Sequence, residues 1–68
     1  MTIDKIKHYI SPIIFEHWTN LHKIVPYAEC KERMTAAYIQ LTNEVESGIR
    51  ENSIKVQAEI YLLKYLMQ

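Results

Sequence analysis

The sequence predicts an all-α protein, a small bundle of three to four helices over approximately residues 3–10, 12–24, 27–51 and 54–67. Glycine occurs once and proline twice in the 68 residues, whereas turn-rich β architectures need more of both. Apolar residues instead recur at spacings of three and four, which is the pattern of one helix face. A chain of this length forms a single domain, residues 1–68.

The first predicted helix, residues 3–10, has a polar start and an apolar side. Thr2 is a suitable N-cap, and Asp4 falls in the first turn, where a negative charge suits the helix dipole. Ile6 and Ile10 lie on one side of the helix because they are four residues apart. A helix this short is marginal alone, so we expect it to form by packing on another element.

The second predicted helix, residues 12–24, has the clearest start signal in the chain. Ser11 is a good N-cap, and Pro12 falls at the first helical position, where its missing N–H costs nothing. Ile10 and Phe15 occupy the two hydrophobic-staple positions. A second proline two residues past the predicted end disfavours helical geometry just before it, so the helix should stop there.

Trp18 is central to the apolar side of this second helix. At about 100° per residue, it shares one stripe with Ile14, Leu21 and Val25. We therefore expect Trp18 to anchor the core. His17 lies inside the same apolar arc, which predicts a partly buried, neutral histidine.

The stretch EHWTNLHKIVPYAEC, residues 16–30, gathers residue types that build metal and catalytic sites. His17 and His22 are five residues apart, about 140° around a helix, so they cannot hold one metal ion as an i,i+4 pair can. Cys30 has no second cysteine to pair with, and its place on an apolar stripe predicts core packing. We therefore expect no metal, no cofactor and no catalytic residues.

The third predicted helix, residues 27–51, carries one continuous apolar stripe. The stripe consists of Tyr27, Cys30, Met34, Ala37, Tyr38, Leu41, Val45 and Ile49. On the polar side, Glu29–Arg33 and Glu46–Arg50 are i,i+4 pairs in the favourable orientation. Ile39 is the exception, an apolar residue on the otherwise polar face.

The boundary at residues 52–53 has two interpretations. Asn52 can end the third helix and Ser53 can cap a fourth. Alternatively the apolar spacing continues without a break, which would make one helix of roughly 40 residues against a mean near 12. We favour the break because it lets the chain fold back and build a core.

The fourth predicted helix, residues 54–67, is apolar on more than one side. Its two stripes are Ile54, Ala58, Tyr61 and Tyr65, and Val56, Ile60, Leu63 and Met67. A helix that is apolar nearly all round is normally buried all round, and so short a chain has hardly enough protein to cover it. The surplus of apolar surface on this helix predicts a homodimer. The candidate interface residues are Val56, Ile60, Leu63, Met67, Tyr61 and Tyr65.

The charge balance and the lack of catalytic motifs narrow the function. Eight basic and eight acidic residues give a formal net charge of zero, which argues against affinity built on many phosphate contacts. The sequence contains no glycine-rich phosphate loop, nucleophile elbow or CxxC motif. By elimination we predict a protein–protein interaction module, a homodimeric regulator, inhibitor or adaptor that is not an enzyme and binds an unidentified protein.

A small DNA-binding protein is the alternative prediction. A helix-turn-helix-like segment over residues 12–40 would use Lys23, Lys31 and Arg33. Glu29 and Glu32 lie beside them in sequence and would oppose phosphates.

The sequence also indicates where the protein is located. No apolar run approaches the ~20 residues of a membrane span, and the first ten residues, MTIDKIKHYI, lack an apolar signal-peptide core. A single cysteine suits a reducing compartment. We therefore predict a cytoplasmic protein without a membrane partner.

Overall fold

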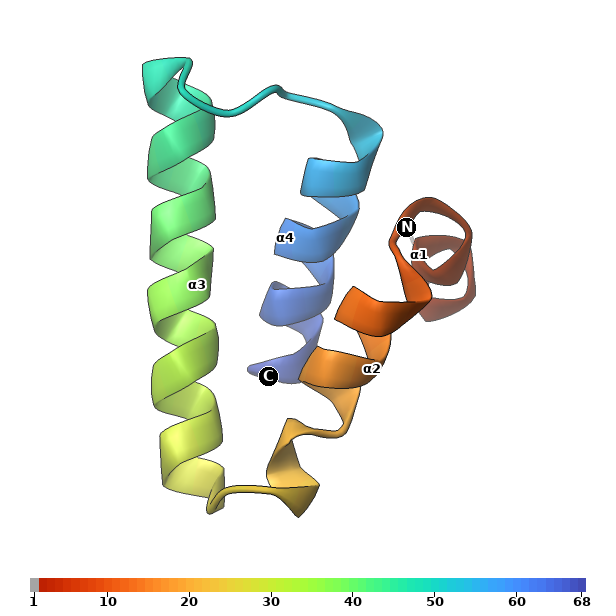
Figure 1. Ribbon diagram of the computed structural model, residues 1–68, viewed down its shortest axis with the longest axis vertical. Helices are drawn as coiled ribbons and strands as arrows, with labels where there is room; N and C mark the ends of the chain where they lie inside the picture. The colour runs from red at the N-terminus through yellow and green to blue at the C-terminus, as the bar shows by residue number, and fades with distance from the viewer. Residues whose placement is uncertain (1) are drawn as a thin grey trace.

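The computed structural model describes residues 2–68 and confirms an all-α bundle for that part of the chain (Figure 1). Its elements are α1 (Ile3–Tyr9), α2 (Pro12–Thr19), a 3₁₀ turn η1 (Leu21–Lys23), α3 (Tyr27–Ser47) and α4 (Ile54–Leu66). The long helix α3 and the returning helix α4 run antiparallel side by side, and α1 and α2 lie on the other side of α4 (Figure 1). The chain therefore wraps its first and third helices around the fourth.

The N-caps of α1 and α2 form as the sequence predicts. The Thr2 hydroxyl accepts the N–H of Lys5 at 3.4 Å, and the Ser11 hydroxyl accepts the N–H of Ile13 at 3.3 Å. Pro12 occupies the first turn of α2. These caps satisfy N–H groups that have no partner within a helix.

The second helix is shorter than the predicted 12–24. Helix α2 ends at Thr19, and the chain tightens into the 3₁₀ turn η1. The Thr19 hydroxyl donates a hydrogen bond to the carbonyl of Phe15 at 2.8 Å, a back-bond that bends helices. Tightening of the last turn is common at helix ends, and here it turns Leu21 into the core, where it is 1% exposed.

The chain does break between the third and fourth helices, so the single long helix is wrong. The predicted end near residue 51 is also wrong, because α3 stops at Ser47 and Gly48 follows with a φ of 81°. Glycine takes this left-handed conformation at little cost, which makes it a common helix terminator. Helix α4 then starts as predicted, with the hydroxyl of Ser53 accepting the N–H of Val56 at 3.4 Å.

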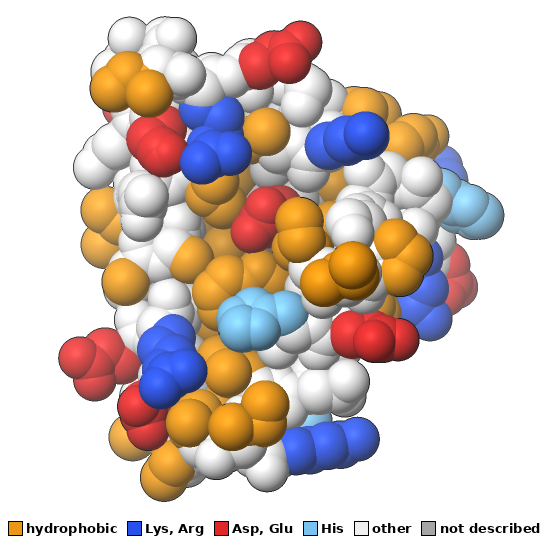
Figure 2. Space-filling model, viewed as in Figure 1, with side chains coloured by type: hydrophobic (Ala, Val, Ile, Leu, Met, Phe, Trp, Pro, Cys, Tyr) orange, Lys and Arg blue, Asp and Glu red, His pale blue; other side chains and the backbone are white. Residues whose placement is uncertain are grey.

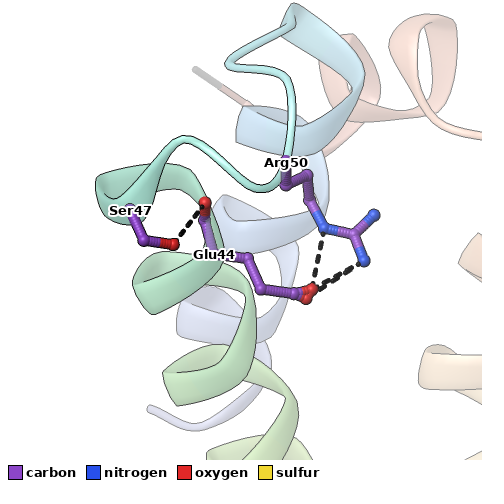
Figure 3. Close-up of polar contacts among 3 residues, drawn as sticks. All are labelled: Glu44, Ser47 and Arg50. Carbon is purple, nitrogen blue, oxygen red and sulfur yellow. Dashed lines mark hydrogen bonds and ion pairs between the residues drawn. The ribbon is translucent and has the colours of Figure 1, made fainter.

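The early stop of α3 also changes one predicted ion pair. Glu29–Arg33 forms at 2.9 Å, but Arg50 lies past the helix end and does not pair with Glu46 as expected. Its guanidinium instead turns back to Glu44, with Nη2 at 3.0 Å from Oε1 (Figure 3). The hydroxyl of Ser47 donates to the Glu44 carbonyl at 3.2 Å. Glu44 thus ties the start of the linker to the last turn of α3.

The core consists of two clusters on opposite flanks of α4. The cluster toward α3 contains Leu21, Cys30, Met34, Leu41 and Leu63. The cluster toward α1 contains Ile6, Ile10, Ala58 and Leu62. Trp18 and Leu66 pack against both clusters. Helix α4 is therefore shared by the whole core.

Trp18 occupies the core position that the sequence predicts, although it is only partly buried. Its indole N–H donates to the Glu59 carboxylate at 3.1 Å. The expectation for His17 is wrong, because this residue is exposed; its ring and that of Trp18 form a T-shaped pair with centroids 4.8 Å apart. With α2 only eight residues long, its buried side is set by Ile14, Phe15 and Trp18, which leaves position 17 outside.

Cys30 packs in the core as predicted. It is 3% exposed, and its thiol donates to the carbonyl of Val25 at 3.5 Å. Burial of this kind is typical of an unreactive cysteine that fills space.

Candidate functional site

The outward face of α4, defined here by Ile54, Tyr61 and Tyr65, presents the largest row of exposed apolar side chains on that helix. These residues are 52%, 38% and 49% exposed, respectively. Ala58 of the same stripe is fully buried together with Leu62 on the flank toward α1, and Leu63 is fully buried on the flank toward α3. The helix therefore uses one side for the core and leaves three large apolar side chains in solvent.

The structure separates the six predicted interface residues. Tyr61 and Tyr65 are exposed, as a contact with another chain requires. Leu63 is 0% exposed inside the chain's own core, which removes it from any interface of the folded protein. The other three, Val56, Ile60 and Met67, are partly buried. Burial follows neither stripe as a whole, because α4 is packed between α3 on one flank and α1 on the other.

A groove between α3 and α4 borders this outward face. Its volume is about 410 Å³. The residues that line it are Tyr38, Thr42, Val45, Glu46, Gln57, Ile60, Tyr61 and Lys64. Val45 and Ile60 are partly buried, whereas Glu46 and Lys64 are exposed. The groove thus combines an apolar floor with one acidic and one basic group at its edges.

A second pocket lies where α2, η1, the start of α3 and the end of α4 meet. Its volume is about 460 Å³. The residues that line it are Trp18, Thr19, His22, Tyr27, Cys30, Lys31, Met34, Leu66 and Met67. Most of these are apolar, and they come from four different elements. The sequence contained no signal for this pocket, because only the fold brings these residues together.

Other large apolar side chains are exposed at scattered positions. Ile13, Ile24 and Ile49 are 79%, 73% and 81% exposed. Ile39 is exposed on α3, as its place on the polar face predicts. On the face drawn in Figure 2, hydrophobic side chains occupy the valley between α3 and α2, and charges of both signs are spread across the surface. A single strongly basic patch does not appear on that face.

The three residues of the DNA-binding alternative do not share one surface. Lys31 and Arg33 are two residues apart, so their side chains leave α3 on opposite sides. Lys31 lines the second pocket, and Arg33 is paired with Glu29. Lys23 is exposed in η1.

Residues 2–68 form neither a metal-binding cluster nor a membrane-spanning helix. No group of three or more His, Cys, Asp or Glu side chains within this part of the chain is arranged to hold a metal ion. None of the helices there is long and apolar enough to cross a membrane. The absence of a metal from the native protein stays a prediction.

Comparison with known proteins leaves the surface as the only guide to function. The chain matches no protein-family model, no curated protein and no solved structure.

Proposed function

We propose that this protein is a helical protein–protein interaction module that pairs with a second copy of itself through the outward face of α4. The observation that carries the proposal is the row of Ile54, Tyr61 and Tyr65, exposed on a helix whose other side is already occupied by the core. Apolar side chains left in water each forgo about 1.5–3 kcal/mol of burial when fully exposed. Three in one row therefore favour association.

The chemistry of this face suits a protein contact. Tyrosine buries a large ring while its hydroxyl stays hydrated or hydrogen-bonded, and it is enriched at interfaces. In an antiparallel, two-fold pairing centred on Tyr61, the two Tyr61 rings approach each other, and Tyr65 approaches Gln57 of the second copy. Like charges do not meet in that arrangement. The surface can thus meet its own copy through aromatic rings without bringing like charges together.

Biologically, such a dimer would act as a regulator, inhibitor or adaptor and would have no catalytic activity. We place it in the cytoplasm, where the free thiol of Cys30 suits reducing conditions.

The DNA-binding alternative receives less support, because Lys31 and Arg33 project from opposite sides of α3 and Arg33 already pairs with Glu29. A mobility shift with DNA that weakens steeply with salt would favour that alternative.

Sedimentation equilibrium tests the dimer. We expect the wild-type protein to be dimeric at ~100 µM and to dissociate on dilution. Tyr61→Glu should give a folded monomer, since it places a charge in the apolar contact. The matched control is Ile49→Glu, which adds the same charge at an apolar side chain that is 81% exposed in the α3–α4 linker. This control should remain dimeric. A wild-type protein that is monomeric at ~100 µM would contradict the proposal.

A further inference from the structure

The pocket at the junction of α2, η1, α3 and α4 has the size and the lining of a small-molecule site. Its volume of about 460 Å³ falls within the roughly 300–1,000 Å³ of known ligand pockets. Cys30 and Met34 are its most buried lining residues, at 3% and 7% exposure. The aromatic rings of Trp18 and Tyr27 also line it. An apolar ligand body would therefore contact rings and sulfur atoms at once.

Among the described residues that line the pocket, the only formally charged side chain is basic. His22 and Lys31 are its two basic lining residues, both are exposed, and no carboxylate is among the described residues that line it. Tyr27 and Cys30 belong to the first turn of α3, where the partial charge of the helix is positive. Glu29 is in the same turn but is bound to Arg33 at 2.9 Å.

The end of α4 borders the pocket as well, and helix C-termini carry the opposite partial charge. Two carbonyls there already have donors. The N–H of Met67 binds the carbonyl of Leu63 at 3.1 Å, and the N–H of Gln68 binds that of Tyr65 at 3.3 Å. These bonds belong to α4 itself and leave its dipole in place, so the positive groups of the pocket come from Lys31, His22 and the start of α3 and not from α4.

From this combination we infer that the pocket binds a small amphipathic carboxylate. The hydrocarbon or aromatic body lies against Trp18, Met34 and Leu66, and the carboxylate stays at the mouth near Lys31 and His22. A lysine can reach such a group while its own methylene stem covers apolar surface. A carboxylate that remains at the mouth keeps much of its hydration, so the arrangement avoids the cost of burying a charge.

The fluorescence of Trp18 reports ligand binding directly, because Trp18 is the only tryptophan in the chain and lines the pocket. Octanoate is the probe, with octan-1-ol and octylammonium as uncharged and cationic controls of equal chain length. We expect octanoate to change the Trp18 emission in a saturable manner. Octan-1-ol should bind roughly fivefold more weakly, the scale of one solvent-exposed charge pair, and octylammonium more weakly still.

Two variants identify the charge responsible. Lys31→Met should weaken octanoate binding roughly fivefold, to the level of octan-1-ol, and should leave the affinity for octan-1-ol unchanged. The matched control Lys5→Met removes an exposed lysine on α1 and should change the affinity for neither octanoate nor octan-1-ol. The Tyr61→Glu variant should retain octanoate binding, because the pocket does not include the outward face of α4.

Three results would overturn the inference. Equal affinity for octanoate and octan-1-ol, or an unchanged octanoate affinity in Lys31→Met, would show that the rim does not select a carboxylate. A Trp18 emission that fails to saturate with any of the three probes would show that the pocket is not a ligand site. None of these results bears on self-association through α4, which is measured separately.

Discussion

The two sides of α4 have similar composition and opposite surroundings. Leu63 on the inner side is fully buried, while Tyr61, only two residues away, is 38% exposed. Both positions belong to apolar stripes, so composition alone does not distinguish them. The difference comes from the neighbours, since α3 covers one flank of α4 and α1 the other. An apolar residue is therefore a core residue only once the packing of its helix is known, and what remains outside is available for a partner.

The largest effect should follow from a charge on the inner side of α4. Leu63→Glu places a carboxylate in the cluster with Leu21, Met34 and Leu41, where no polar group compensates it. We expect the loss to match the whole stability of a small domain, about 5 kcal/mol. Circular dichroism should show an unfolded or aggregated chain, whereas Tyr61→Glu keeps its helical signal. A folded Leu63→Glu variant would break the distinction between the two sides.

A smaller loss is expected at Trp18, which packs on the inner side of α4. Trp18→Ala removes a partly buried ring that contacts both core clusters, and we expect a loss of about 3 kcal/mol, the lower end for such truncations. Trp18→Phe retains a ring but loses the hydrogen bond to Glu59 at 3.1 Å, which should cost about 1 kcal/mol. Denaturant midpoints measure both changes. An unchanged midpoint for Trp18→Ala would show that the residue is peripheral.

The turn at Gly48 determines how α4 returns along α3, and its substitution should have an intermediate effect. A β-carbon at Gly48 would meet nothing within 4 Å, so only the φ of 81° opposes a side chain. We expect Gly48→Ala to lower the free energy of unfolding by about 1–2 kcal/mol. Gly48→Asn should lower it less, because asparagine tolerates this conformation better. Equal stability of Gly48→Ala and the wild type would contradict this account.

The features that the sequence predicted are those that depend on local spacing. Caps at Ser11 and Ser53 and the Glu29–Arg33 pair each involve residues within four positions of one another, and helical periodicity places them without knowledge of the fold. The end of α3 was also within reach, because Gly48 is the only glycine in the chain. The apparent continuity of the apolar stripe through Ile49 concealed it.

The features that the sequence missed depend on contacts between elements. The exposure of His17 depends on where α2 ends, and the pairing of Arg50 with Glu44 depends on the path of the linker. The choice between the two stripes of α4 needed the positions of both flanking helices. The pocket at the junction of α2, η1, α3 and α4 needed all four elements, and its residues are distributed between Trp18 and Met67. Periodicity describes one helix at a time and contains none of this information.

The smallest effect on the folded monomer should follow from changes on the outward face of α4. Ile54→Gln and Tyr65→Gln alter side chains that are 52% and 49% exposed, so each should change the stability of the dilute protein by at most about 0.5 kcal/mol. At high protein concentration, the same substitutions should strongly reduce dimer formation and the stability that it adds. A dimer that forms only from folded chains raises the melting temperature as the concentration rises. We therefore expect the wild-type melting temperature to increase with protein concentration and that of the doubly substituted protein to stay constant. Calorimetry over a hundredfold concentration range measures this difference. If both proteins melt at a temperature independent of concentration, the outward face is exposed without a second copy to cover it, and the contrast between the two sides of α4 has no role in self-association.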